Sequence, residues 1–395
     1  MLYLLKNLSS LDGFGPFRIF GSHLVLICIG AALSLILSYF LLPRLWNRLP
    51  RDRGKGLTPD GKQSAGKPTG AGIIFFLLTL PVLFLVLPIH STSHQAFIAD
   101  DGSFNWNGFS ILLSKEWLCV WCIYLAMFCG FFDDHSKKPW GRGKKLVLDF
   151  AISFLAGVAL CKFQSMEIWL PFTKVTFEVS WLTYSLIATL VIVISLNATN
   201  CSDGIDGLVG TQTVISLLVI TVLLYGVVGH EKIAEYLLVP HNPDGAYWAI
   251  LTSSFVGALL AYLWYNAEPS VVLMGDAGSR GLGMLMGIAI MAMGNPFIIF
   301  AIMPVVLTDG ICGLIKIIYL SSLKLIGKGV EKVPTTEEEF SAMPFYHRIA
   351  FLFRCPVHDH FRKNKGWSKI QVVIRFLIIQ LIAMPTLLLL ILKIR

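Results

Sequence analysis

The sequence has few charged side chains for its length. Only 14% of its 395 residues are charged, whereas 55% are hydrophobic; an ordinary soluble domain has about 25% charged residues. So few polar side chains cannot coat a water-soluble globule of this size. The composition therefore excludes a soluble enzyme and a soluble binding module, and it predicts an integral membrane protein.

The sequence also lacks a second cysteine pair of the kind that forms a metal site, and its first residues do not have the pattern of a cleavable leader. The eight cysteines lie mostly inside apolar runs. Cys119 and Cys122 form a CxxC in a helical stretch with no second pair nearby, so we interpret them as buried small hydrophobic residues. The chain does not open with a short apolar stretch and a small-residue cleavage site, and we expect no cleaved signal peptide.

Long apolar runs are abundant. A helix needs about 20 apolar residues to cross the hydrocarbon core of a bilayer. We therefore expect one all-α polytopic membrane domain over residues 1–395, in which the third and eighth spans are short and need support from neighbours. The ten predicted spans are residues 22–42, 71–88, 117–132, 146–163, 181–197, 207–229, 247–265, 281–294, 296–323 and 371–392.

The connecting segments differ in positive charge. Alternate segments, namely 43–70, 133–145, 198–206, 266–280 and 324–370, hold 22 of the 32 Lys and Arg residues, and the opposite set holds 7. The positive-inside rule assigns the first set to the cytoplasm, so both termini are predicted to face outward. The net charge of +8 is then a topology signal, and we expect no nucleic-acid partner.

The unusual polar clusters fall in these five cytoplasmic segments. Segments that are distant in sequence can converge on one site when they share a membrane face. The clusters are GKQSAGKPTGAG (61–72), GFFDDHSKK (130–138), NATNCSDGIDGLVG (197–210), LMGDAGSRGLG (273–283) and CPVHDHFRKNKGW (355–367).

Five aspartates near the predicted hydrocarbon boundary require an explanation, because charges there are expensive. For any one of them a solvated helix end is the simpler interpretation, but five flanked by Gly and Asn favour a cation site. Carboxylate and amide oxygens suit Mg²⁺, which keeps several waters and takes phosphate oxygens from its substrate. The five are Asp133, Asp134, Asp203, Asp206 and Asp276.

The spacing of these residues predicts how they divide their roles. Asp133 and Asp134 are adjacent, so on a helix their side chains diverge by about 100° and serve different functions. Asn197, Asn200 and Asp203 recur every three residues, which keeps them near one helical face.

Basic and imidazole side chains accompany the aspartates. Two histidines in a basic segment, His358 and His360, favour contact with phosphate or sugar. For Lys144 and Lys145, anchoring at the membrane surface is an equal alternative to phosphate binding. The side chains that can neutralise phosphates are Lys62, Lys137, Lys144, Lys145 and Arg280.

Span 296–323 carries polar residues inside an apolar run. Pro304 and Gly310 predict a break or bend in this helix. Asp309 and Lys316 are seven residues apart and share a face. A structural polar pair and a functional pair both remain open for these two side chains.

Taken in order, these motifs resemble the polyprenyl-phosphate N-acetylhexosamine-1-phosphate transferase superfamily, and within it the phospho-N-acetylmuramoyl-pentapeptide transferase family. The ten-span layout with both ends outward is also similar to that family. The resemblance covers most of the chain, through Lys62, the Pro68–Thr69 segment, GFFDDHSK, NATNCSDGIDGL, MGDAGS, PVHDHF, KGW and VVIRFLII.

The resemblance implies an activity and a setting. Phospho-MurNAc-pentapeptide would pass from UDP-MurNAc-pentapeptide to undecaprenyl phosphate, giving lipid I and UMP, in the first membrane step of peptidoglycan synthesis. The enzyme would require Mg²⁺, form a homodimer, and lie in the bacterial cytoplasmic (inner) membrane with its active site facing the cytoplasm. A relative that uses UDP-GlcNAc or a similar sugar is the alternative enzyme. An ion-coupled secondary transporter is the alternative from another class, although acidic motifs at one face and the lack of a repeat disfavour it.

The resemblance also implies residue roles. Asp276 would bind Mg²⁺, with Asp203 as a second candidate ligand. Asp133 would be the base or orienting group at the lipid phosphate, supported by Asp134. We expect a one-step in-line displacement, and a two-step route through a phosphorylated aspartate stays open. The implied substrate-binding residues are Lys62, Thr69, Lys137, Lys145, Asn197, Asn200, Asp203, Asp206, His358 and His360.

The sequence departs from the family pattern at several places. Asp359 replaces the middle of three consecutive histidines, and Leu273 replaces an aromatic residue before MGD. The stretch 328–354 is longer than the family's, and the apolar group within it, residues 345–353, is expected to form an amphipathic helix at the membrane interface.

Overall fold

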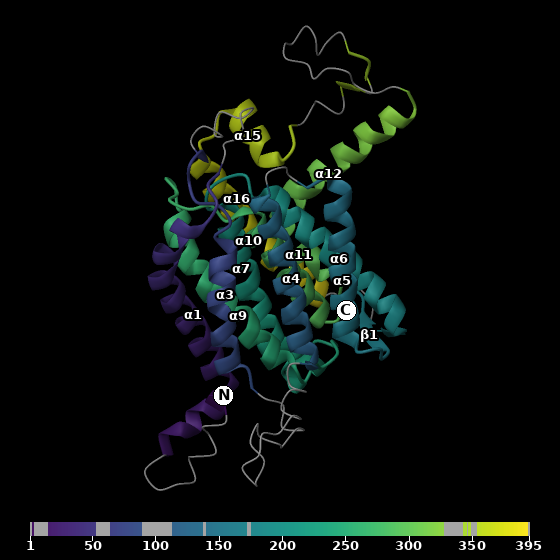
Figure 1. Cartoon of the computed structure of the whole chain (residues 1–395). Helices are drawn as coiled ribbons and strands as arrows, with labels where there is room; N and C mark the ends of the chain where they lie inside the picture. The colour runs from purple at the N-terminus through teal and green to yellow at the C-terminus, as the bar shows by residue number, and fades with distance from the viewer. Residues whose placement is uncertain are drawn as a thin grey trace.

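The computed structural model describes residues 2–3, 15–52, 64–88, 113–136, 140–171, 175–327, 343–345, 347–348 and 354–393. Each of the ten predicted spans contains a helix within this part of the chain (Figure 1). The long helices are α1 (His23–Leu45), α3 (Gly72–Val86), α4 (Lys115–His135), α5 (Arg142–Cys161), α6 (Trp181–Ser202), α7 (Leu208–Val222), α9 (Gly245–Asn266), α10 (Gly275–Ala292), α12 (Pro304–Leu325) and α16 (Lys369–Lys393). The short ones are η2 (Gly15–Gly21), η3 (Trp46–Arg48), η5 (Leu223–Val228), α8 (Glu231–Tyr236), α11 (Ile298–Ile302) and α15 (Val357–Lys365).

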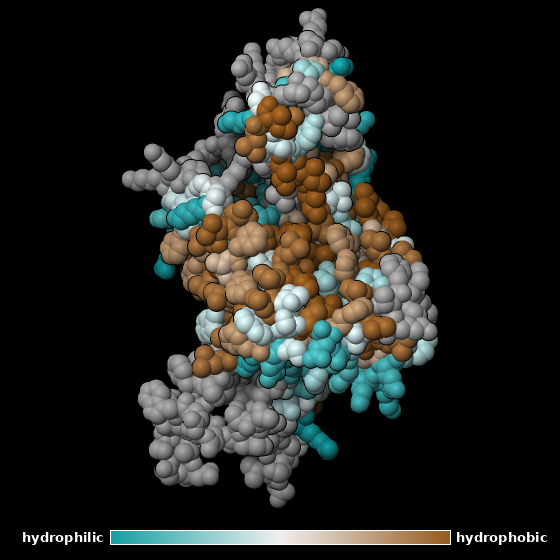
Figure 2. All heavy atoms as spheres, turned by 90° about the vertical axis from the view of Figure 1, so that its right-hand side faces the viewer, coloured by the Kyte–Doolittle hydropathy of each residue, from teal (hydrophilic) through white to brown (hydrophobic). Residues whose placement is uncertain are grey.

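The helices have the length and composition of membrane spans. Among the described helices, seven are long and apolar enough to cross a membrane, and α3 is apolar but has 15 residues. Figure 2 shows apolar side chains gathered over the middle of one face, with hydrophilic side chains along its lower edge. The protein is therefore a mostly helical, polytopic membrane protein, as its composition predicted.

One element departs from an all-α chain. Strands β1 (Met166–Trp169) and β2 (Thr176–Val179) form an antiparallel pair between α5 and α6, where the sequence pattern predicted only a connecting segment. The buried ring of Trp169 donates from Nε1 to the Met293 carbonyl at 3.0 Å, which attaches this hairpin to the end of α10. The hairpin lies at the opposite end of the bundle from α15 (Figure 1).

The predicted break in span 296–323 is confirmed and lies between α11 and α12. Met303 leaves helical geometry (φ −125°, ψ 39°), and Pro304 starts the next helix. Gln380 of α16 is fully buried there. Its amide donates to the Ile302 carbonyl at 2.8 Å, and its oxygen accepts from the Val305 N–H at 3.3 Å. The side chain therefore satisfies backbone groups that the break releases inside an apolar bundle.

Helix α10 lies at the centre of the bundle. It is buried from Ala277 to Met291 and packs against α3, α4 and α6. Small residues in its sequence, GDAGSRGLGMLMGIA, allow this close packing. Its first turn consequently lies between the ends of several helices, and that turn contains Asp276.

A glycine contact between α1 and α9 gives a first prediction. A Cβ atom built on Gly257 would lie 1.9 Å from the Ala31 carbonyl oxygen. Gly257→Ala should therefore force the two helices apart and destabilise the protein by about 1–3 kcal/mol. Thermal unfolding in detergent measures this, with Gly226→Ala as the matched control because a methyl there meets nothing within 4 Å. Equal melting temperatures for the two variants would contradict the prediction.

Candidate active site

Two aspartates from separate motifs meet at one ammonium group. Lys145, in the first turn of α5, forms an ion pair with Asp133 at the end of α4. The same Nζ lies 2.9 Å from Oδ2 of Asp276 at the start of α10. The structure therefore brings together these three residues that the sequence analysis singled out. The side chains of Lys145 and Asp276 remain 25% and 28% exposed, so a ligand can reach them.

The Asp276 carboxylate is held from two sides. Asn200 of α6 donates to its Oδ1 at 3.0 Å and also to Ser279 Oγ at 3.0 Å. Burial favours the neutral acid, but the Lys145 ammonium and the Asn200 hydrogen bond outweigh it and hold the pKa of Asp276 below its ordinary value. Burial also opposes the charge of Lys145, yet Asp276 and Asp133 raise the pKa of its ammonium. Both groups are therefore ionised near neutral pH.

Asp133 and Asp134 diverge as their adjacency predicted. Asp133 is buried, and its Oδ1 accepts a hydrogen bond from the Trp140 N–H at 2.7 Å. Asp134 turns toward α10 instead, where its Oδ2 accepts from the Ala277 N–H at 3.2 Å. Asp133 therefore faces the Lys145 ammonium, while Asp134 holds the first turn of α10 in place.

A second ion pair lies one turn deeper between the same two helices. Asp149, four residues after Lys145 on α5, pairs with Arg280, four residues after Asp276 on α10. The two side chains are only 2% and 4% exposed. Along α5 a positive residue is followed by a negative one, and along α10 the order is reversed, so opposite charges face each other at both levels. Arg280, expected from sequence to neutralise phosphates, is instead committed to a buried pair.

The three polar residues on α6 occupy different levels. Asn197 donates to the Val193 carbonyl at 2.9 Å and lies beside the Asp149 carboxylate, at the level of the deeper ion pair. Asn200 reaches Asp276 one turn further on. Asp203 ends the helix with non-helical geometry (φ −78°, ψ 61°) and is half-buried. Of the three evenly spaced residues, the two asparagines therefore contact the aspartates of this region: Asn200 binds Asp276, and Asn197 lies beside Asp149.

Asp206 belongs to a separate charged cluster. Its Oδ2 lies 3.8 Å from Lys67 Nζ and 3.9 Å from Lys369 Nζ, so it joins the first motif segment to the start of α16. Lys369 also pairs with Glu268 at 3.1 Å. The side chain of Asp206 is 13% exposed.

The first and fourth motif segments pair through their backbones. Leu273 donates to the Pro68 carbonyl at 2.8 Å, and Ala71 donates to the Leu273 carbonyl at 3.0 Å. Thr69, between them, is half-buried, and its N–H donates to the Pro50 carbonyl at 2.9 Å. The backbone of Leu273 thus keeps the segment containing Thr69 beside the start of α10.

The structure separates the two predicted histidines. His358 is 3% exposed and pairs with Asp309. His360 is half-buried, and its Nδ1 accepts from the Arg354 N–H at 3.4 Å. Asp359 between them pairs with Lys363 at 2.9 Å. Lys62, Lys137 and, from the expected interfacial helix, residues 346 and 349–353 lie outside the described residues.

The two carboxylates beside Lys145 suit a hard cation that takes only a few ligands from the protein. Within the described ranges, no group of three or more His, Cys, Asp or Glu side chains gathers closely enough for an all-protein metal site. Mg²⁺ does not need one, because it is commonly held by one or two carboxylates, waters and substrate phosphates. Asp133 and Asp276 already face one positive charge, and carboxylate oxygens are the ligands that Mg²⁺ prefers.

The sequence pattern did not predict the role of Asp149 or the partner of Asp309. Asp149 lies inside an apolar run, and its signal is the spacing of opposite charges four apart, once with Lys145 and once between Asp276 and Arg280. Asp309 was noticed, but its same-face neighbour Lys316 was considered as its partner. Both carboxylate oxygens of Asp309 in fact interact with His358.

Comparison with known proteins gives consistent matches. The model of the family described as Glycosyl transferase family 4 matches residues 117–294. A phospho-N-acetylmuramoyl-pentapeptide-transferase of Treponema pallidum (strain Nichols) is 35% identical over 383 residues, covering 96% of this chain and 93% of the relative. A protein of the same name in Bartonella quintana (strain Toulouse) is 29% identical, and the match covers 85% of this chain and 83% of the relative. Another in Aliarcobacter butzleri (strain RM4018) is 28% identical, and the match covers 88% of this chain and 88% of the relative.

The matched segment covers most of α4 and all of α5, α6 and α10, the helices that carry Asp133, Lys145, Asn200 and Asp276. The apolar helices and these matches together identify the chain as an integral membrane phosphosugar transferase. With 35% identity over nearly its whole length to a named relative, the chain belongs to the phospho-N-acetylmuramoyl-pentapeptide-transferase family.

Proposed function

We propose that this protein transfers phospho-MurNAc-pentapeptide from UDP-MurNAc-pentapeptide to undecaprenyl phosphate. The products are lipid I and UMP, and the reaction is the first membrane step of peptidoglycan synthesis. The observation that carries the proposal is the meeting of Asp133 and Asp276 at the Lys145 ammonium, where α4, a helix long and apolar enough to cross a membrane, ends beside the starts of α5 and α10. Membership of the family supports the identity of both substrates.

The site has what this reaction requires of a protein. Phosphoryl transfer depends mainly on alignment of the reacting groups and on stabilisation of charge. In the proposed one-step route, an oxygen of the lipid phosphate attacks the sugar-linked phosphorus in line, and UMP leaves. Asp133 orients the lipid phosphate or accepts its proton, and Lys145 offsets the negative charge of the crowded phosphates. Trapping of a covalent phosphosugar–enzyme species would favour the two-step route instead.

The remaining predicted residues have supporting roles in the proposal. Asn200 keeps Asp276 oriented, and Asp134 fixes the first turn of α10. Thr69, Asp203 and His360 contact substrate from the neighbouring segments, together with Lys62 and Lys137. Asn197, Asp206 and His358 support the nucleotide and pyrophosphate region through the contacts described above.

We assign Mg²⁺ to Asp276, with Asp133 facing the same point. Asp203 stays a second candidate ligand because it ends the helix that carries Asn200. The ion would neutralise charge on the phosphates as it develops. Asn200 holds Oδ1 of Asp276 and Lys145 lies at Oδ2, so the carboxylate would be shared between Lys145 and the ion when the ion is bound.

The topology completes the proposal. The apolar runs predict ten spans, and the excess of Lys and Arg in alternate segments, 22 against 7, predicts that both termini face outward. This topology makes the site face the cytoplasm of the bacterial inner membrane, where the soluble nucleotide substrate is available. The family resemblance supports a homodimer.

Release of UMP tests the function. Purified protein with UDP-MurNAc-pentapeptide, undecaprenyl phosphate and Mg²⁺ should release UMP, and EDTA should stop the release. Omission of undecaprenyl phosphate is the control for hydrolysis. Parallel reactions with UDP-GlcNAc in place of the first substrate should give little UMP. Faster release from UDP-GlcNAc would overturn the proposed sugar specificity, and no release from either donor would overturn the function.

A further inference from the structure

A buried aspartate and a buried histidine make two contacts with each other. Asp309 of α12 accepts a hydrogen bond from the backbone N–H of His358 at 2.9 Å through Oδ1. Its Oδ2 lies 2.7 Å from Nδ1 of the His358 ring. The side chains are 2% and 4% exposed. This double contact fixes both the position of the first turn of α15 and the orientation of the imidazole.

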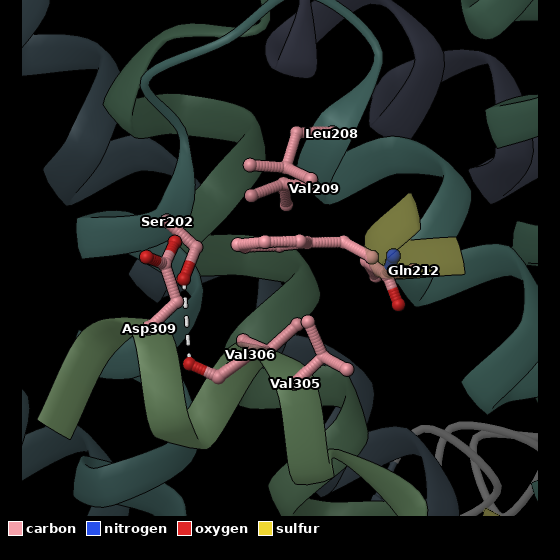
Figure 3. Close-up of a pocket in the computed structure, with 8 residues that line it drawn as sticks. Ser202, Leu208, Val209, Gln212, Val305, Val306 and Asp309 are labelled. Carbon is pink, nitrogen blue, oxygen red and sulfur yellow. Dashed lines mark hydrogen bonds between the residues drawn. The ribbon is translucent and has the colours of Figure 1, made fainter. Parts of the chain in front are cut away.

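The surroundings of Asp309 give this contact its importance. Asp309 lies at one edge of a small pocket, beside Ser202 and opposite apolar side chains (Figure 3). A carboxylate among such neighbours is strongly disfavoured unless hydrogen-bond donors satisfy it. The backbone N–H of His358 is one such donor, and the ring Nδ1 lies at hydrogen-bond distance from the second carboxylate oxygen. The pocket is lined by Ser202, Leu208, Val209, Gln212, Val305, Val306, Asp309 and Phe376.

The opposite edge of the His358 ring faces a motif of the candidate active site. A Cβ atom built on Gly204 would lie 2.4 Å from Nε2 of His358, so only glycine leaves room for the ring. Gly204 follows Asp203 in the turn after α6, and α6 carries the Asn200 that holds Asp276. A continuous set of contacts therefore runs from Asp309 through His358 to the turn beside the site.

We propose that Asp309 is a positioning residue that sets the tautomer of His358. A carboxylate accepts hydrogen bonds, so Nδ1 of a neutral imidazole must carry the proton and donate it to Asp309. Nε2 then presents a lone pair toward the turn at Gly204. Unprotonated, Nε2 fits closely against Gly204, and this contact keeps the turn, and through it Asn200, in the geometry that the transfer step requires. The proposal rests on the proposed function, because the reaction is its readout.

Asp309→Asn separates this role from a purely structural one. Asparagine has nearly the same shape and retains one oxygen acceptor, which can serve the His358 backbone N–H. Its NH₂ then faces Nδ1 and favours the other tautomer, with Nε2–H toward Gly204. We expect kcat for UMP release to fall by about tenfold or more, with the KM for UDP-MurNAc-pentapeptide within about threefold of wild type.

The matched control is Asp359→Asn, the same chemical change on the neighbouring residue. Asp359 pairs with Lys363 on the surface of α15, and its variant should keep kcat within about twofold of wild type. A wild-type kcat in Asp309→Asn would overturn the proposal. Absence of UMP release from the wild type itself would indicate failure of the proposed function, which is a distinct result.

His358→Asn keeps the test decisive even if Asp309→Asn fails to fold. Its side-chain NH₂ can still donate to Asp309 from the place of Nδ1, but it has no acceptor in the place of Nε2. We expect the same fall in kcat, an unchanged elution volume in detergent, and no further loss in the Asp309→Asn/His358→Asn double variant. Full activity of His358→Asn would overturn the proposal. So would a double variant whose kcat falls by the product of the two single-variant losses.

Discussion

Replacement of Asp276 by asparagine should lower the rate of UMP release by about a thousandfold or more while leaving the protein folded. The carboxylate has two functions at once: it is the proposed Mg²⁺ ligand, and it forms the ion pair with Lys145 at 2.9 Å. Asparagine keeps an oxygen that can accept from Asn200, but it presents no negative charge to the proposed Mg²⁺ or to the Lys145 ammonium. The loss should therefore appear in kcat, with the protein still inserted in membranes.

The rate is measured as UMP released by purified protein at saturating Mg²⁺. Asp244→Asn is the matched control, because Asp244 pairs with Lys115 next to the start of α9, away from the candidate site. It should retain the wild-type rate. More than a tenth of the wild-type rate in Asp276→Asn would refute the role assigned to this carboxylate.

Loss of one partner of the buried Asp149–Arg280 pair should be the most damaging change to stability. Asp149→Leu leaves the Arg280 guanidinium buried without its counter-charge, which typically costs about 3–5 kcal/mol. Replacement of both partners, as in Asp149→Leu/Arg280→Met, removes the buried charges together and should restore much of the stability. The deeper pair lies one turn below Lys145 and Asp276, so its loss also disturbs the site.

Thermal unfolding of the two single variants and the double variant in the same detergent tests this. We expect low melting temperatures for Asp149→Leu and Arg280→Met, and a higher one for the double variant than for either. A double variant that is less stable than both single ones would show that the charges themselves stabilise the bundle.

Much of the fold follows from the sequence because apolar length determines helices in a membrane. All ten predicted segments contain helices, and Pro304 correctly marks the break in span 296–323. The hairpin of β1 and β2 was missed. Its strands have four residues each, and the buried ring and the backbone N–H of Trp169 attach them to the end of α10. Such a contact depends on the tertiary packing and leaves no periodic signal.

The site was predicted in part for a similar reason. The positive-inside rule predicts that Asp133, Lys145 and Asp276 share one membrane face, and the structure brings the three side chains together. Helical spacing, however, identifies neighbours on the same helix and not partners on another one. Asp309 was therefore considered with Lys316 although it binds His358, and Arg280 was interpreted as a phosphate ligand although it pairs with Asp149.

Binding of Mn²⁺, a spectroscopic substitute for Mg²⁺, tests most directly whether Asp133 and Asp276 meet at one cation site. Electron paramagnetic resonance of the free ion, titrated against purified protein without substrates, reports the amount bound. We expect a bound ion in the wild type and in Asp244→Asn, and a loss of binding of about tenfold or more in both Asp133→Asn and Asp276→Asn. Undiminished binding in Asp276→Asn would contradict the shared site.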